Sequence, residues 1–342
     1  MAKTVKMADI AQKVGVSVVT VSKALKGQKG VSESTRLQIL KLADEMGYIQ
    51  PSTAIRRETK GHNIGIIIHD KYFSKYNSFY LQMYQMLTSL LGAQGDFAIL
   101  ELITHDMEKE QTAPNLLKEN KIDALVIQGE FSRQYCKFIK SVAGSIPLVY
   151  LDFGDESQTE VSVISDSFYG SYYMTNYLFE KGHRDIAFVG SLLQTTSITD
   201  RYLGYVKSMM EHGIQVRPDW QIEDRDKKTG IIFDPDKLPL PLELPTAFVC
   251  NCDLAAGVLI KRLEKDGYKV PEDFSVVGYD NYIFPGVCDV GITTYEVDMS
   301  VMVQKAVSYL TALLKGEDVK METHIITGHL IEKDSVKALS IS

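Results

Sequence analysis

The sequence predicts an all-α helix-turn-helix headpiece at the N-terminus, followed by an α/β core of two lobes with parallel sheets. Three observations lead to this fold class. Basic residues are concentrated near the N-terminus, the first fifty residues carry a helix-turn-helix pattern, and the rest of the chain alternates short apolar runs with amphipathic helical stretches. The 342 residues, 45% of them hydrophobic, can bury more than one core, and roughly two domains is the expectation from length.

Charge is divided unevenly along the chain. Residues 1–60 contain eleven Lys and Arg against five Asp and Glu, whereas the remaining residues contain 26 basic and 39 acidic side chains. A basic head on an acidic body indicates that the head meets a polyanion. A solvated basic face would explain the charge equally well, so the local pattern has to decide between the two.

That local pattern is helix, tight turn, helix. Segment 7–14 (MADIAQKV) has apolar residues at helical spacing, Gly15 supplies the turn, and Ser17 can cap a second helix over 18–25 (VVTVSKAL). A third amphipathic helix is predicted from Ser32, with Gly47 ending it. The predicted core-facing side chains of the second and third helices are Val21, Ala24, Leu25, Leu37, Leu40, Ala43 and Met46.

The outer face of the second helix is expected to contact DNA. Val18 and Val19 are poor helix formers that gain nothing from exposure to water, but a major groove offers them thymine methyl groups. Lys23 can reach guanine acceptors, and hydroxyl groups near a helix N-terminus can hold phosphates. The alternative is three packed helices without a ligand. The candidate DNA contacts of the headpiece are Lys6, Ser17, Val18, Val19, Thr20, Ser22 and Lys23.

Residues 6–27 read KMADIAQKVGVSVVTVSKALKG, and residues 31–48 read VSESTRLQILKLADEMGY. These segments resemble the headpiece of the bacterial lactose-repressor/galactose-repressor transcription factors, and the likeness extends to about residue 335. The resemblance implies a homodimer that reads a pseudo-palindromic operator in double-stranded DNA. It also implies a hinge helix in the minor groove, a periplasmic-binding-protein-like core, and a small-molecule effector that sets operator affinity.

The resemblance further implies a division of the chain into three parts. These are a headpiece (1–51), a hinge segment (52–60) and an effector-binding and dimerisation domain (61–342). Within this domain, lobe 1 is expected over about 61–161 and 292–323, and lobe 2 over about 162–291 and 324–342. The apolar helix from Met299 would cover lobe 1, which is also the expected dimer surface.

The hinge segment departs from the family. Members carry a leucine that wedges between base pairs, but its position here is Arg57 counted from Tyr48, or Glu58 counted from Pro51. Ile55 is the nearest apolar substitute. We therefore expect Arg56 and Arg57 to enter or flank a narrow, A·T-rich minor groove, with DNA bent less than is usual in the family.

Seven short apolar runs in the body predict strands, and amphipathic stretches separate them. Ligands of such sheets bind beyond the carboxyl ends of the strands. Polar residues that follow or end five of the runs are Asp70, Gln128, Asp152, Asn251 and Asp280. The runs cover residues 63–70, 97–103, 122–128, 146–152, 185–190, 246–251 and 274–280.

The family resemblance selects effector-binding candidates among these and other residues. Asp152, Asp280 and Asn251 provide acceptors and donors for vicinal hydroxyls, and Arg201 adds a planar fork, which suits a sugar. Tyr80 could stack on a sugar face or a base, or equally pack at the start of the first core helix, as could Phe79. A nucleobase-type corepressor is the alternative effector. The candidates are Tyr80, Gln128, Asp152, Asp166, Ser197, Arg201, Arg225, Asn251 and Asp280. Ser197, Arg225 and the additional residue Thr195 carry less weight, because these positions vary with ligand type in the family.

Other classes of function find little support. No run of eighteen apolar residues predicts a membrane span, and no signal peptide precedes the headpiece, so a cytoplasmic protein is expected rather than a transport-type sugar receptor. The four cysteines lack metal-ligand spacing and are expected to be reduced. The segment GSLLQTTS is not a phosphate loop, and no activated nucleophile is evident, so neither an enzyme nor a cofactor is expected.

Overall fold

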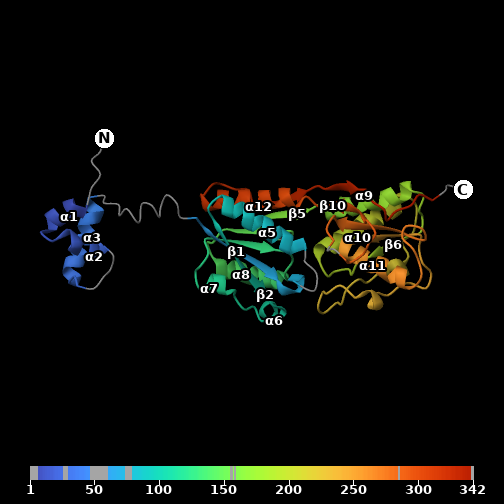
Figure 1. Ribbon diagram of the computed structural model, residues 1–342, viewed down its shortest axis with the longest axis horizontal. Coiled ribbons are helices and arrows are strands. Elements are labelled where there is room, and N and C mark those ends of the chain that lie inside the picture. The colour runs from blue at the N-terminus through green and yellow to red at the C-terminus, as the bar shows by residue number, and fades with distance from the viewer. Residues whose placement is uncertain are drawn as a thin grey trace. The chain divides into compact units, whose positions relative to one another are not determined.

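The computed structural model describes residues 7–25, 30–46, 61–73, 79–154, 157, 159–283 and 286–339. It divides into two compact units, Met1–Gly61 and His62–Ser342. Figure 1 shows both units. The predicted hinge segment 52–60 lies outside the described residues.

The first unit is the predicted helix-turn-helix. Its helices are α1 (Met7–Val14), α2 (Val18–Leu25) and α3 (Glu33–Glu45). Gly15 forms the turn at φ +76°, a conformation that favours glycine. The Ser17 hydroxyl accepts a hydrogen bond from the Thr20 amide at 3.1 Å, which confirms the predicted cap of α2. The Ser32 hydroxyl caps α3 in the same way, accepting from the Thr35 amide at 3.3 Å.

The headpiece core differs from the prediction in its third helix. Leu37 and Leu40 are 60% and 43% exposed, so the expectation that they face the core was wrong. Ile39 and Ala43, four residues apart, form the buried face, and Leu37 lies about 200° around the helix from Ile39. The fully packed headpiece residues are Ile10, Ala11, Val21, Ala24, Ile39 and Ala43.

Lobe 1 of the second unit is built on a six-stranded parallel sheet in the order β11-β5-β4-β3-β1-β2. Its strands are β1 (Asn63–His69), β2 (Phe97–Ile103), β3 (Ala124–Gln128), β4 (Leu148–Leu151), β5 (Val161–Ser165) and β11 (Thr323–Ile326). The accompanying helices are η1 (Asp70–Phe73), α5 (Phe79–Ala93), α6 (His105–Lys109), α7 (Asn115–Lys118), α8 (Arg133–Ala143) and α12 (Met299–Leu314).

Helices cover both faces of this sheet. In β1, Ile66 clusters with Met83 of α5, whereas the next residue, Ile67, clusters with Ile139 of α8. Alternate side chains of a strand point to opposite faces, so a strand covered on both sides reads as a continuous apolar run. Helix α12 packs against α5, β4 and β5, as expected for the helix that covers lobe 1 (Figure 1).

Lobe 2 repeats this architecture with the order β12-β10-β9-β8-β6-β7, in which β12 alone is antiparallel to its neighbour. Its strands are β6 (Ile186–Val189), β7 (Gln221–Ile222), β8 (Ala247–Cys250), β9 (Ser275–Asp280), β10 (Thr293–Glu296) and β12 (His329–Ile331). Its helices are α9 (Ser167–Glu180), α10 (Thr196–Glu211), η2 (Pro218–Trp220), η3 (Pro235–Lys237) and α11 (Asp253–Lys265).

The chain crosses between the lobes three times. The crossings follow Ser165 of β5, Glu296 of β10 and Ile326 of β11, a few residues later in each case than the expected limits at 161, 291 and 323. The reason is that each of these strands completes the sheet of the lobe that the chain is leaving. Because β5, β10 and β11 are short and carry Ser, Thr or His, they lack the apolar run that marked the other strands.

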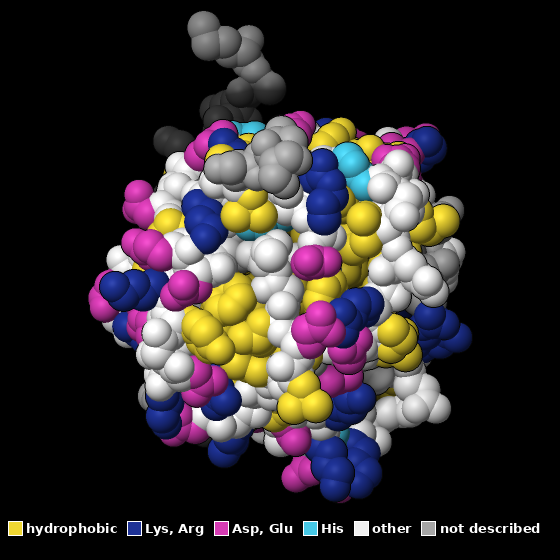
Figure 2. Space-filling model, turned by 90° about the vertical axis from the view of Figure 1, so that its right-hand side faces the viewer, with side chains coloured by type: hydrophobic (Ala, Val, Ile, Leu, Met, Phe, Trp, Pro, Cys, Tyr) yellow, Lys and Arg dark blue, Asp and Glu magenta, His cyan; other side chains and the backbone are white. Residues whose placement is uncertain are grey.

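The surface of the core is mixed in charge. Figure 2 views the core from the lobe 2 end and shows basic and acidic side chains interspersed with apolar patches. This face therefore has no uniformly basic surface among the residues that the structure describes. Within the same residues, no helix is long and apolar enough to cross a membrane.

Candidate functional sites

The outer face of α2 presents the side chains expected to read DNA. Val18 and Val19 are 46% and 63% exposed, and Lys23 is exposed, whereas Val21 between them is fully buried. The hydroxyls of Ser17 and Thr20 bond to each other at 2.9 Å at the start of the helix. Ser22, also a predicted contact, is half-buried on α2, whereas Lys6, Ile55, Arg56 and Arg57 lie outside the described residues.

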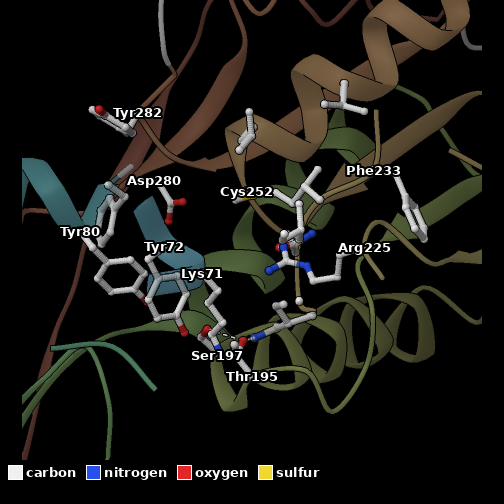
Figure 3. Close-up of a pocket in the computed structure, with 18 of the residues that line it drawn as sticks. Lys71, Tyr72, Tyr80, Thr195, Ser197, Arg225, Phe233, Cys252, Asp280 and Tyr282 are labelled. Carbon is white, nitrogen blue, oxygen red and sulfur yellow. Dashed lines mark hydrogen bonds between the residues drawn. The ribbon is translucent and has the colours of Figure 1, made fainter. Parts of the chain in front are cut away.

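A cavity of about 470 Å³ lies between the two lobes of the core, beyond the carboxyl ends of their strands (Figure 3). Lobe 1 contributes side chains that follow β1 and β4, and lobe 2 contributes side chains that follow β6, β7, β8 and β9. Seven of the nine predicted effector-binding residues line it: Tyr80, Asp152, Ser197, Arg201, Arg225, Asn251 and Asp280.

Arg201 is at the centre of the polar part of this cavity. Its guanidinium donates to the Asn251 carbonyl, lies 3.4 Å from the Asp280 carboxylate and stacks 3.6 Å above the Tyr279 ring. Only 6% of the residue is exposed. Its Nε has no hydrogen-bond partner among the described residues, although it is buried. A buried donor without a partner gains from a ligand that supplies an acceptor.

Two carboxyl groups lie near Arg201. Asp152, from lobe 1, accepts a hydrogen bond from the Tyr80 hydroxyl at 2.9 Å. Burial raises the pKa of Asp152 to about 6, although the Arg201 charge opposes this shift. Burial likewise raises the pKa of Asp280 to about 7, again against the Arg201 charge. Both groups therefore take up protons between about pH 6 and pH 7, well above the usual range of a carboxyl group.

A second polar cluster holds Arg225. Asp224 accepts two hydrogen bonds from its guanidinium, at 3.0 Å and 2.7 Å, in bidentate geometry. Asn251 bonds to both partners, since its Nδ2 donates to Asp224 at 2.8 Å and its Oδ1 accepts from Arg225 at 3.0 Å. Burial would raise the pKa of Asp224, but Arg225 and these hydrogen bonds lower it below its ordinary value. Arg225 is thereby fixed as a cation at the cavity wall.

Residues 6–51 match the family model described as bacterial regulatory proteins of the lacI family, and residues 175–336 match the periplasmic binding protein-like domain. The chain belongs to the LacI family. It is a DNA-binding transcriptional regulator with an effector-binding core, in a family of regulators rather than enzymes. The resemblance noted in the sequence is confirmed.

Similar proteins span nearly the whole chain. The HTH-type transcriptional repressor PurR of Vibrio campbellii is 28% identical over 335 residues, which cover 97% of this chain and 98% of that protein. A solved lac repressor dimer, bound to operator and the anti-inducer ONPF, matches with a TM-score of 0.66 at 22% identity, covering 98% of this chain and 100% of that one. The complex of the regulator CelR with cellobiose matches with a TM-score of 0.65 at 18% identity, covering 97% and 99%.

Two of the predicted effector residues of this LacI-family regulator do not line the cavity. Gln128 ends β3 in the middle of the lobe 1 sheet and is buried, where its amide donates to the Tyr80 carbonyl at 2.6 Å. Asp166 caps α9 at the first crossing between the lobes, accepting from the Tyr169 amide at 3.2 Å. Gln128 thus orients a residue that lines the cavity, and Asp166 has a structural role at the crossing.

The sequence reasoning also missed a contact between the lobes. The Glu130 carboxylate, which follows β3 in lobe 1, accepts from the Thr196 amide at 2.6 Å and from its hydroxyl at 3.2 Å, in the first turn of α10 in lobe 2. A helix N-terminus favours a negative charge. Burial nevertheless raises the pKa of Glu130, and the Thr196 hydrogen bonds oppose this shift. These bonds join the lobes directly at one side of the cleft.

The cysteines and candidate metal ligands add no further site. Cys136 and Cys250 are buried, Cys252 and Cys288 are half-buried, and all four are free thiols. Cys252 caps α11 through its sulfur, which accepts from the Ala255 amide at 3.5 Å. Across the ranges that the structure describes, no cluster of His, Cys, Asp and Glu has the arrangement of a metal site.

The raised pKa of the cleft carboxyl groups predicts a pH dependence of stability. Asp280 holds its proton up to about pH 7 in the folded state, against an ordinary pKa of 3.8. The folded state therefore binds more protons between these values, and the stability that this group contributes at low pH is lost as pH rises toward 7. We expect urea unfolding of the effector-free protein to show this loss, and Asp280→Asn to reduce it. An unchanged pH profile in that variant would contradict the assignment.

Proposed function

We propose that this regulator binds a pseudo-palindromic operator as a homodimer, with its dimer surface on lobe 1, and that a sugar bound in the cleft sets operator affinity. The proposal rests on one observation. Four polar residues line the same cavity: Asp152, Arg201, Asn251 and Asp280. Carboxylates accept hydrogen bonds from adjacent hydroxyls, while the guanidinium donates to them, which is the pattern that a polyol requires.

The placement of these groups supports a coupling between ligand and DNA. Asp152 belongs to lobe 1, whereas Arg201, Asn251 and Asp280 belong to lobe 2. A ligand that bonds to both sides favours one relative orientation of the lobes, and in a dimer this changes the spacing of the two headpieces. Couplings of this kind typically amount to about 1 to 3 kcal/mol.

A nucleobase is the second candidate effector. The ring centroids of Tyr72 and Tyr80 lie 4.2 Å apart, and those of Phe79 and Tyr282 lie 6.4 Å apart across the lobes in an edge-to-face arrangement. Aromatic walls of this kind can stack on a planar base. These rings also suit the apolar face of a sugar. The Tyr80 hydroxyl already donates to Asp152, and this hydrogen bond fixes the orientation of the Tyr80 ring at the cavity.

The proposal can be tested by measuring the unfolding temperature of the full chain in the presence of individual sugars and nucleobases. A ligand at 100 times its dissociation constant adds about 2.7 kcal/mol to the stability of the folded state. We expect a sugar to raise the unfolding temperature and to change operator affinity measured by fluorescence anisotropy. A nucleobase that does both, while sugars do neither, would overturn the sugar assignment and support the alternative.

Base readout by α2 leads to a specific prediction for Lys23. Replacing Lys23 with Ala should relax the preference at one base pair, because a good contact to a base edge discriminates by about 1 to 3 kcal/mol. Lys13→Ala removes an exposed lysine of α1 and serves as the control, with base preference retained. Binding measured over a set of single-base operator variants distinguishes the outcomes. Equal weakening on every sequence would make Lys23 a phosphate contact.

The hinge residues lead to a prediction about DNA shape. With Arg56 and Arg57 in or beside the minor groove, operators with an A·T-rich centre should bind best, and the bend should be small. A DNA-bending assay with Ile55→Ala and Arg57→Ala checks this. A sharp central kink that disappears in Ile55→Ala and survives Arg57→Ala would instead identify Ile55 as a wedge.

A further inference from the structure

The turn at the end of β9 has an uncommon backbone conformation. Its two consecutive residues Asp280 and Asn281 have φ values of +102° and +51°. Residues other than glycine rarely adopt positive φ, and they keep such a conformation only where their surroundings enforce it. Asp280 and Tyr282 line the effector cavity, whereas Asn281, between them, does not (Figure 3). The turn therefore presents the Asp280 carboxylate to the cavity and leaves the Asn281 side chain to other partners.

The partners of the Asn281 side chain belong to the segments that connect the lobes. Its Nδ2 donates to the Glu296 carboxylate at 2.8 Å, and its Oδ1 accepts from Lys333 Nζ at 2.7 Å. Glu296 ends β10 at the second crossing, and Lys333 follows β12, which the chain enters after the third crossing. Glu296 also pairs with His329 of β12 in antiparallel register, so the two crossings lie side by side next to Asn281.

An amide suits this position better than an acid would. Asn281 offers a donor to the carboxylate of Glu296 and, at the same time, an acceptor to the ammonium group of Lys333. An ionised aspartate has acceptors only, so at this position it would set a second negative charge against Glu296. The chemistry of the Asn281 side chain is thus matched to both crossings.

Asp253, at the start of α11, holds the same turn from the interior of lobe 2. Its buried carboxylate accepts a hydrogen bond from the Tyr282 amide at 2.9 Å. Gly278 leaves room for this carboxylate, because a Cβ atom at residue 278 would overlap it. Since the turn is fixed on both sides, a displacement of Asp280 also displaces Asn281.

We propose that Asn281 is a positioning residue that couples the effector cavity to the second and third crossings. A ligand that bonds to Asp280 shifts the turn, and the hydrogen bonds of Asn281 pass this shift to Glu296 and Lys333, which changes the relative orientation of the lobes. The inference rests on the proposed control of operator affinity by an effector and adds the contacts through which this control acts. Because Asn281 does not line the cavity, it governs the response to a ligand more than the affinity for it.

An exchange of acid and amide tests the coupling without any ligand. Asn281→Asp keeps the size of the side chain and its tolerance of positive φ, but sets a second carboxylate against Glu296. On a duplex selected with the unaltered protein, we expect the operator affinity of the ligand-free full chain to change by at least about fivefold. Adding Glu296→Gln restores a donor opposite the new carboxylate, and the affinity should return to within about twofold of its original value.

The matched control is the same substitution elsewhere in lobe 2. The side-chain oxygen of Asn176, on α9, accepts from the Ser208 hydroxyl at 2.9 Å, and Asn176→Asp retains this acceptor outside the cavity and the crossings. It should leave operator affinity unchanged, and circular dichroism should show every variant folded at the assay temperature. An unchanged affinity in Asn281→Asp, or one that Glu296→Gln fails to restore, would overturn the proposal.

Ligand probes separate this inference from the proposed function. The probes are D-glucose, D-galactose, D-ribose, cellobiose, adenine and guanine. For a probe that changes operator affinity of the unaltered chain, Asn281→Asp should keep its dissociation constant, measured by calorimetry, within about threefold and lose most of the operator response. A full response in that variant would also overturn the coupling. If no probe alters operator binding by the unaltered chain, the proposed effector function fails, whereas the ligand-free comparison still decides the role of Asn281.

Discussion

Arg201→Ala should abolish the effector response and destabilise the core. The substitution removes the cation that lies between Asp152 and Asp280 and the donor to the Asn251 carbonyl. Breaking a buried ion pair typically costs about 3 to 5 kcal/mol, and we expect the lower end because Asp280, with a pKa of about 7, can take up a proton. Urea unfolding and ligand-induced thermal shift measure the two effects.

The loss of stability in Arg201→Ala should depend on pH. Without the guanidinium, the carboxyl groups are uncompensated when ionised, so the variant should be less impaired at pH 5.5 than at pH 8. Arg217→Ala is the matched control, because Arg217 pairs with Asp219 and Glu243 on the surface of the same lobe. It should leave stability nearly unchanged, because exposed ion pairs contribute little to folding. A normal effector response in Arg201→Ala would exclude Arg201 from the site.

A chain that begins at Gly61 should lose specific DNA binding and keep effector binding. The first unit ends at this residue, and the core beyond it has its own packed clusters. Specific binding to an operator exceeds non-specific binding by about 10³-fold or more, and this margin should vanish in an anisotropy assay. The thermal shift caused by a bound ligand should be unchanged.

A point variant of the full chain tests whether DNA binding requires the folded headpiece and not only its amino-acid sequence. Val21 is fully buried among the three headpiece helices, so Val21→Asp should unfold the headpiece by placing an unpaired charge in its core. This variant should match the truncated chain in both assays. Specific operator binding by the truncated chain would contradict the assignment of DNA binding to residues 1–60.

The parts of the cleft that follow from strand order could be predicted from sequence. Asp152, Asn251 and Asp280 follow or end apolar runs, and the carboxyl ends of parallel strands meet at one edge of a sheet. The same reasoning placed Gln128 in the cleft, but the Gln128 amide donates to the Tyr80 carbonyl at the start of α5 instead. Asp280 is likewise the last residue of its strand and does line the cavity, so position at a strand end does not by itself decide which side chains reach the cleft.

The residues that sequence reasoning missed depend on contacts that a linear pattern does not contain. Asp224 follows β7, which has only two residues and leaves no apolar run to mark its end. Its position directly before Arg225 was the available signal. Glu130 bonds to a residue 66 positions later in the other lobe. Likewise, the buried face of α3 was misassigned because leucines recur on two sides of that helix, and packing selects between them.

The return of the chain to lobe 1 has a consequence for biosynthesis. Strand β11 and helix α12 belong to lobe 1, yet they are translated after the whole of lobe 2 up to β10. Until residues 299–326 leave the ribosome, the face formed by β4, β5 and α5 lacks the helix that covers it. Exposed apolar surface in an incomplete chain favours aggregation, and contacts distant in sequence form slowly. Lobe 2 in turn lacks β12 until residues 329–331 are translated, so neither lobe completes its sheet before the C-terminal segment of the regulator emerges.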